Sequence, residues 1–276
     1  MTSQPSLMKL LWGQAGYQNK VFFRNPTAAF FTLLFPLMIF VVFALIFGNE
    51  YIEELGINVA QYYAPAMAVF AAVSATYTNL AVTTAYQRDE GILKRVKGTP
   101  LPPSIYMGGK ILSAIMIAII SVVIMMSIGV VFYGVNIYAA TLPAVIVTFL
   151  VGVGCFAALG LMVAALVSSG ESATAVTNAT LLPLAFISGV FIVPSEEAPA
   201  WLDTVANIFP LKHFVEPFVA AFNPLNQGSG FDWVSLGVMA LWGAVAIVIA
   251  VRFFKWEASP GSSRKPRRGK KVAAEA

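Results

Sequence analysis

Charged residues are scarce in this chain. Only 11% of its 276 residues are Asp, Glu, Lys or Arg, whereas 58% are hydrophobic and the mean hydropathy is +0.79. A soluble domain is about 25% charged and about 45–50% apolar. The composition therefore excludes an ordinary soluble globule and an intrinsically disordered chain, and it is typical of a membrane protein.

Cysteine and histidine are almost absent. The one cysteine, Cys155, cannot form an intramolecular disulfide, and the one histidine, His213, lacks a second histidine as a metal-binding or catalytic partner. The signatures of zinc metalloproteases and serine hydrolases do not occur. A Walker A loop is also missing, because the Gly-Lys pairs at 109–110 and 269–270 lack the upstream glycine and the following Ser or Thr. The sequence predicts a non-enzymatic chain that holds neither ATP nor a metal.

Ionisable residues are missing from the longest apolar runs. A helix needs about 20 mostly apolar residues to cross the bilayer's hydrocarbon core. Six uncharged runs meet that length and predict six transmembrane helices, at 28–47, 62–86, 111–133, 141–167, 173–193 and 233–251. Proton- and ion-coupled carriers place ionisable groups at membrane depth. We therefore expect any transport to be powered by another chain.

The basic residues predict the orientation. Every Lys and Arg except Lys212 lies before the first run, between the second and third, or after the sixth. By the positive-inside rule, these segments and both termini are expected in the cytoplasm. The expected fold class is therefore an all-α membrane protein with six transmembrane helices, formed by residues 28–253.

The two terminal segments are expected to meet lipid. Residues 1–27 are predicted to contain an amphipathic helix with only basic charges, as suits an anionic membrane surface. Residues 254–276 are basic and rich in Ser, Gly and Pro, which predicts a disordered tail. A nucleic-acid partner is not expected for a six-span chain.

A long outer segment separates the fifth and sixth runs. It contains two apolar stretches, around 201–209 and 212–222, that are each too short to cross a bilayer. They predict interfacial or re-entrant helices at the outer leaflet.

The cytoplasmic loop 87–110 has an unusual pattern. Its charges crowd into 88–97, and the prolines that follow prevent a continuous helix. A short charged helix before a rigid turn would suit docking to a cytosolic partner. Positive-inside chemistry alone would explain the basic residues but neither the acidic residues nor the prolines, and composition does not decide between the two. The candidate docking residues are Arg88, Asp89, Glu90, Gly91, Lys94, Arg95, Thr99 and Pro100.

Uncharged polar residues concentrate in the second and fifth runs. Amides and hydroxyls in hydrocarbon need partners, so these residues should meet each other, another subunit or a water-filled path. Helix packing alone is one interpretation, and a mildly polar cavity lined by both helices is the other. The candidate path residues are Thr76, Asn79, Thr83, Thr177, Asn178 and, as an apolar contact, Phe186.

Four features, in order along the chain, resemble the ABC type-2 transporter permeases, the membrane subunits of many bacterial ABC exporters. The first is the basic segment that ends at Arg24-Asn25-Pro26, and the second is the loop 88–95 followed by Thr99-Pro100, which is similar to the family's E-x-G-T-L-x-x-L…TP region. The third is the segment 188–194 that runs on to Pro199-Ala200-Trp201-Leu202, which is similar to the family's G-x-F-x-P…P-x-W element. The fourth is the segment 207–211, which is similar to the family's NP turn. The size resembles that of daunorubicin-resistance-type exporters. Phe209 stands where the family has Asn before proline.

The resemblance implies an exporter in the bacterial inner membrane, with two permease subunits, identical or paralogous, and two ATPase subunits that bind ATP and Mg. The loop would fit a groove on each ATPase, and the second and fifth helices would line the path. An uncharged lining favours a lipophilic or amphipathic cargo. A lipid or glycan precursor is an alternative cargo. A lipid-modifying enzyme using Glu196, Glu197, Asp203 and His213 is a further alternative.

Overall fold

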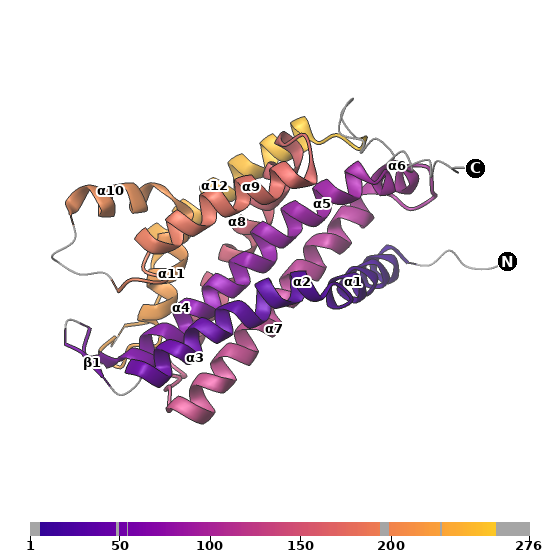
Figure 1. The fold of residues 1–276 in the computed structure, drawn as a ribbon. Coiled ribbons are helices and arrows are strands. Elements are labelled where there is room, and N and C mark those ends of the chain that lie inside the picture. Colours follow the sequence, from indigo (N-terminus) through magenta and orange to yellow (C-terminus); the bar gives the residue numbers. More distant parts are fainter. Residues whose placement is uncertain (1–5, 48–49, 54, 194–198, 227, 258–276) are drawn as a thin grey trace, which may run out of the picture.

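The computed structural model describes residues 6–47, 50–53, 55–193, 199–226 and 228–257 of the protein. This part is mostly helical, with its long helices side by side in one bundle (Figure 1). The helices are α1 (Leu7–Phe23), α2 (Pro26–Ala29), η1 (Phe30–Leu34), α3 (Phe35–Phe47), α4 (Val59–Val73), η2 (Ser74–Asn79), α5 (Leu80–Asp89), α6 (Ile92–Lys97), α7 (Pro103–Tyr133), α8 (Leu142–Leu166), α9 (Gly170–Ile187), α10 (Ala200–Ile208), α11 (Pro210–Ala220) and α12 (Trp233–Phe253). Two short strands, β1 (Tyr51–Ile52) and β2 (Ile57–Asn58), pair antiparallel with Tyr51 opposite Asn58. The sequence did not predict this hairpin.

In the described part of the chain, five continuous helices are long and apolar enough to cross a membrane. They are Pro26–Phe47 (α2, η1 and α3), Val59–Asp89 (α4, η2 and α5), α7, α8 and α12. The prediction of a mostly helical chain with several membrane-spanning helices is thereby supported. The predicted spans 28–47, 62–86, 141–167 and 233–251 agree closely with four of these helices.

The third span begins earlier than predicted. The sequence placed its start at 111, after a lysine, but α7 begins at Pro103. Proline is favoured in the first turn of a helix, and the helix continues through Gly108 and Gly109 with no further proline before position 111. The charge of Lys110 marks a change in hydropathy and not the start of the helix. Lys110 therefore lies inside α7, where it is 3% exposed.

The predicted fifth span, 173–193, is wrong at both ends. The helix α9 starts at Gly170, where Ser169 caps it, and it ends at Ile187. Gly189 then adopts a φ of +78°, which turns the chain, and Tyr62 Oη donates a 2.6 Å hydrogen bond to the Gly189 carbonyl. The apolar residues after Ile187 thus extend the hydropathy run but not the helix. The 18-residue helix α9 is not among the five helices above, so the count of six spans stays a prediction.

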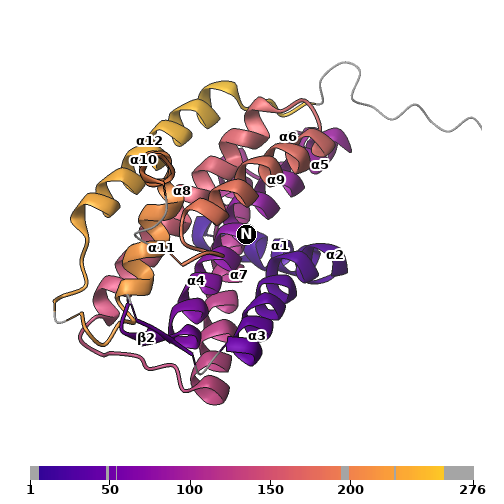
Figure 2. The same ribbon diagram turned by 60° about the vertical axis from the view of Figure 1, so that its left-hand side comes forward.

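The centre of the bundle is α4. Every residue of this helix is buried, and α3, α7 and α11 pack against it. Figure 2 shows α3 on one side of α4 and α7, and α12 on the other. The outward faces of α3, α7 and α12 remain rich in exposed apolar side chains, as expected for helices in contact with lipid.

The predicted N-terminal helix is present as α1. It packs on α7 through Ala15, Gln18 and Phe22, and it leaves Trp12 and other apolar residues exposed. Gly109 of α7 permits the close crossing, because a Cβ there would lie 2.7 Å from Gln14 Cβ. Its place on a membrane surface stays a prediction. A disordered tail is predicted for residues 254–276, and those after 257 lie outside the described residues.

The two short helices predicted between the fifth and sixth runs form close to the predicted stretches, as α10 and α11. Phe214 and Phe218 of α11 are almost fully buried, and α11 packs against α4, α8 and α12. Aromatic burial of this kind holds α11 within the bundle and not on its surface. A re-entrant position in the membrane stays a prediction.

Candidate functional site

The predicted docking loop forms a short helix, α6, at one end of the bundle (Figure 1). Gly91 starts it with a φ of +72°, a left-handed conformation that favours glycine. Leu93 is fully buried and anchors the helix, whereas Glu90, Lys94 and Arg95 are exposed. The result is a charged surface held on an apolar anchor.

The turn after α6 is also ordered by a side chain. The Thr99 hydroxyl donates to the Val96 carbonyl at 2.7 Å and accepts from Leu101 N at 3.4 Å. Both Thr99 and Pro100 are exposed. Threonine here closes the helix before the prolines, which cannot continue it.

Two of the candidate docking residues point into the bundle. Arg88 is 2% exposed, and its guanidinium donates to the Ala164 and Val167 carbonyls at the end of α8, both at 2.7 Å. The Asp89 carboxylate accepts from Gly170 N at the start of α9, also at 2.7 Å. These contacts satisfy helix-end groups that would otherwise lack partners. They join the base of α6 to the α8–α9 junction.

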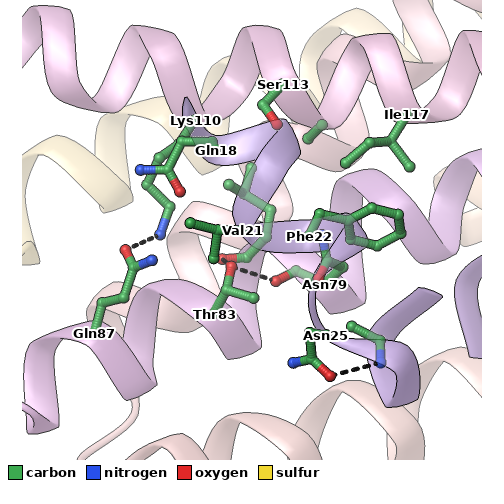
Figure 3. A pocket seen from close by; sticks show the side chains of 13 residues that line it. Gln18, Val21, Phe22, Asn25, Asn79, Thr83, Gln87, Lys110, Ser113 and Ile117 are labelled. Atoms are coloured by element: carbon green, nitrogen blue, oxygen red, sulfur yellow. Dashed lines mark hydrogen bonds between the residues drawn. The ribbon is translucent and has the colours of Figure 1, made fainter. Parts of the chain in front are cut away.

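The candidate path residues do not share one cavity. Asn79 and Thr83 line a cavity of about 40 Å³ between α1, α5 and α7, together with Lys110 (Figure 3). Thr76 and Thr177 are buried and donate to carbonyls of their own helices, at Ala72 and Ala173, both at 2.8 Å. Such bonds are the usual way for a threonine to satisfy its hydroxyl inside a helix.

Asn178 and Phe186 lie on an exposed face of α9. Leu182, between them at helical spacing, is exposed as well. This face mixes an amide with apolar side chains, and no other described element of the chain covers it. This face of α9 is therefore accessible to lipid or to another protein chain.

A π-helical turn in the second span was not foreseen. η2 (Ser74–Asn79) interrupts the α-helical pattern between α4 and α5. Tyr77, within it, shares a 2.7 Å hydrogen bond with Thr180 of α9. Such turns widen a helix locally and occur often at functional sites. The candidate path residues Thr76 and Asn79 belong to it.

Comparisons with known proteins identify the family. A family model described as ABC-2 type transporter matches residues 11–223. The chain belongs to the ABC-2 type transporter family. Its matched region runs from within α1 to just beyond α11, so α6, the cavity of Figure 3 and the exposed face of α9 all lie inside it.

Individual relatives of this ABC-2 permease are distant. The daunorubicin resistance ABC transporter permease protein DrrB1 of Streptomyces coeruleorubidus is 24% identical over 78% of this chain and 74% of its own length. The putative transport permease YvfS of Bacillus subtilis is 21% identical over 88% and 92%. The probable multidrug ABC transporter permease YbhR of Escherichia coli is 25% identical over 49% of this chain and 36% of its own length. Membership of the ABC-2 permease family implies that this chain has an ABC ATPase partner.

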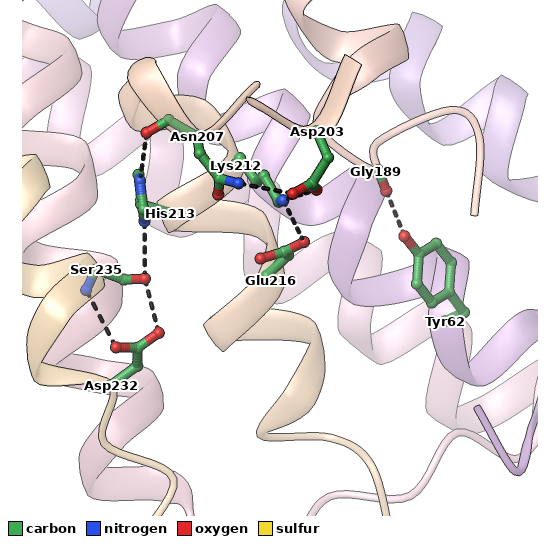
Figure 4. A network of polar contacts seen from close by, with 9 residues as sticks. All are labelled: Tyr62, Gly189, Asp203, Asn207, Lys212, His213, Glu216, Asp232 and Ser235. Carbon is green, nitrogen blue, oxygen red and sulfur yellow. Dashed lines mark hydrogen bonds and ion pairs between the residues drawn. The ribbon is translucent and has the colours of Figure 1, made fainter. Parts of the chain in front are cut away.

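The other end of the permease carries a closed polar network (Figure 4). Lys212 is 7% exposed and forms ion pairs with Asp203 and Glu216, the latter at 3.4 Å. The Lys212 ammonium lowers the pKa of Asp203 through its hydrogen bond, whereas burial raises the pKa of Glu216. Each charge of this network therefore has a partner.

Of the four residues proposed for a lipid-modifying enzyme, the structure describes Asp203 and His213, which both contact Asn207 and form no hydrogen bond with each other. His213 contacts the Asn207 carbonyl at 2.9 Å and the Ser235 hydroxyl at 3.0 Å, while Asp203 is engaged by Lys212. Glu196 and Glu197 lie outside the described residues. Within the described ranges, no cluster of three His, Cys, Asp or Glu side chains could hold a metal.

Proposed function

We propose that this permease is the membrane subunit of an ATP-driven exporter in the bacterial inner membrane, which moves a lipophilic or amphipathic, drug-like compound outward. The observation that carries the proposal is α6, a charged and exposed helix on a buried anchor, within a chain of the ABC-2 family. The names of DrrB1 and YbhR, with drug resistance and multidrug transport, support the cargo class. ATP and Mg would bind to the partner ATPase.

In this proposal α6 is the coupling element. Glu90, Lys94 and Arg95 dock into a groove on the ATPase, with both termini of the permease on the same cytoplasmic side. When two ATPase subunits close on ATP, each pushes one α6. Arg88 and Asp89 pass the displacement to the α8–α9 junction, because they bond to backbone groups there.

The cargo path would run along α9. Its exposed face, with Asn178 and Phe186, would lie opposite the same face of a second permease, identical or paralogous. Movement at the α8–α9 junction would then tilt α9 and switch the path from inward-open to outward-open. The uncharged character of that face fits a cargo without strong charge.

The test uses the permease co-expressed with its ATPase and reconstituted in proteoliposomes. Exchanging the charges of Glu90 and Lys94 (Glu90→Lys with Lys94→Glu) should lower ATP-dependent export of a lipophilic fluorescent dye at least tenfold, since each side chain would then face a group of like charge on the ATPase. Arg252→Glu, an exposed residue at the same end of the bundle on α12, is the matched control and should keep export. Equal export by the double variant and the wild type would refute α6 as the coupling element.

A further inference from the structure

The cavity of Figure 3 contains a buried lysine without a counter-charge. Lys110 is 3% exposed, and its Nζ donates to Gln87 Oε1 at 2.7 Å. That oxygen also accepts from Tyr106 Oη at 2.8 Å, so two donors share it. Among the described residues, no carboxylate forms an ion pair with Lys110. A buried ammonium is costly unless its charge is balanced and its three donors have acceptors.

A second donor in the cavity also lacks a partner. Gln18 of α1 is 7% exposed, and its Nε2 donates to no group in the described part of the chain. Figure 3 shows the Gln18 amide on the same side of the cavity as the Lys110 ammonium. The two groups come from α1 and α7, and both can only donate hydrogen bonds through their nitrogen atoms.

The other walls of the cavity add amide donors and no acidic side chain. The oxygens of two lining amides are engaged, because Asn25 Oδ1 accepts from Ala28 N at 3.1 Å and Gln87 Oε1 accepts twice. Within the described residues, the NH₂ groups of Asn25 and Gln87 have no partner. None of the residues that line the cavity is Asp or Glu. Such a lining suits an anion, since hydrogen bonds to an ionised acceptor are the stronger ones.

The size and opening of the cavity limit the ligand. Its volume is about 40 Å³, which is room for about two or three water molecules. A small inorganic ion fits this space, whereas a lipid head group with its glycerol does not. The cavity reaches the surface at Asn25, which is exposed. Lys20 and Arg24, exposed nearby on the same segment, attract anions to this opening.

We propose that this cavity binds one small inorganic anion, for which chloride is the probe, between the Lys110 ammonium and the Gln18 amide. The anion supplies the negative charge that the buried lysine lacks, and it accepts hydrogen bonds from α1 and α7 together. It thereby strengthens the attachment of α1 to α7, where Ser113 Oγ already donates to Asn19 Oδ1. The site goes beyond the proposed function and does not depend on it.

The experiment is thermal unfolding of the permease in detergent, with chloride replacing gluconate at constant ionic strength. Gluconate is too large for the cavity. A ligand that binds only the folded state stabilises it, so about 200 mM chloride should raise the wild-type unfolding midpoint by about 2–4 °C. Lys110→Met should abolish this rise, whereas Lys255→Met, an exposed control at the same end, should keep it.

Two results of this experiment would overturn the proposal. An equal rise in the wild type and Lys110→Met would be a general salt effect. No rise in the wild type would mean that Lys110 needs no anion, as expected of a lysine that stays uncharged.

A second variant keeps the test decisive if Lys110→Met does not fold. Gln18→Leu removes a donor that has no partner within the described chain, so it sacrifices no hydrogen bond of that donor. This variant should need about tenfold more chloride for its half-maximal rise, as expected for one lost hydrogen bond to a charged group. Tyr17→Phe, at an exposed position of α1, is the matched control and should respond like the wild type. The same chloride dependence in Gln18→Leu and Tyr17→Phe would contradict the proposed site.

Two further measurements locate the site and identify the source of the anion. Chloride should slow hydrogen exchange of α1 and leave α10 unchanged, because the cavity contacts only α1 of the two; slowing confined to other helices would refute the location. Dioleoyl-phosphatidylglycerol added without chloride should not restore the difference between the wild type and Lys110→Met. A Lys110-dependent rise with this lipid would assign the site to a lipid phosphate and overturn the proposal of a free ion.

Discussion

The two ends of the bundle each bury a lysine, and the two lysines have different partners. Lys212, at the end that carries α10, has two carboxylate partners. Lys110, towards the end that carries α6, has one neutral amide oxygen. The first lysine completes a network within the chain, whereas the second leaves its charge unbalanced. Removing one partner of a buried ion pair leaves the other charge uncompensated, whereas a buried charge without a partner already carries its desolvation cost.

The same contrast extends to the surfaces. At the α10 end, α11 is packed among α4, α8 and α12, and the polar groups bond to one another. At the other end, Glu90 before α6 and Lys94 and Arg95 within it are exposed. In the proposed function, the first end has a structural role and the second end contacts the partners.

The largest expected loss of stability comes from the paired lysine. Lys212→Met should lower the free energy of unfolding by about 2 kcal/mol, because Glu216 and Asp203 lose their cation. The figure is below that of a fully buried pair, since both carboxylates are partly exposed. Thermal unfolding in detergent measures it, with Lys255→Met as the surface control. An unfolding midpoint that Lys212→Met leaves unchanged would contradict the structural role of the Lys212 network.

The α1–α7 crossing at the other end should be next in size. Gly109→Ala places a methyl group against Gln14 and should cost about 1–2 kcal/mol, because α1 must move away from α7. Gly13→Ala on α1, with open space around it, should be neutral or slightly stabilising. Hydrogen exchange of α1 measures the effect locally. Equal protection of α1 in both variants would show that the crossing is not tight.

The smallest effect is expected for the unpaired lysine. Lys110→Met in chloride-free detergent solution should change the unfolding midpoint little or raise it, because removing an unbalanced charge relieves its desolvation. Gln87 keeps the Tyr106 hydroxyl as a partner. A loss as large as that of Lys212→Met in the same assay would contradict the distinction between the two lysines.

Most of the fold could be predicted from hydropathy, because long uncharged runs report directly on membrane-crossing helices. Helix ends could not be predicted in the same way. Hydropathy changes at Lys110, but the α7 backbone does not, and the apolar run after Ile187 continues past the end of α9. The π-helical turn η2 depends on packing against neighbouring helices and has no signature in composition.

The candidate site was predictable in part. Charge density indicated α6, and its exposed residues agree with that interpretation. The inward direction of Arg88 could not be foreseen, because its carbonyl partners on α8 are distant in sequence and have no side-chain signature. The role of every site residue stays a prediction until it is measured.

The most direct test of the account is site-specific photo-crosslinking in membranes that contain the permease and its ATPase. A photoreactive amino acid at Lys94, on α6, should give an adduct with the ATPase. The same amino acid at Trp201, exposed on α10 at the other end, should give none. An adduct from Trp201, or its absence from Lys94 in an assembled complex, would contradict the assignment of the two ends.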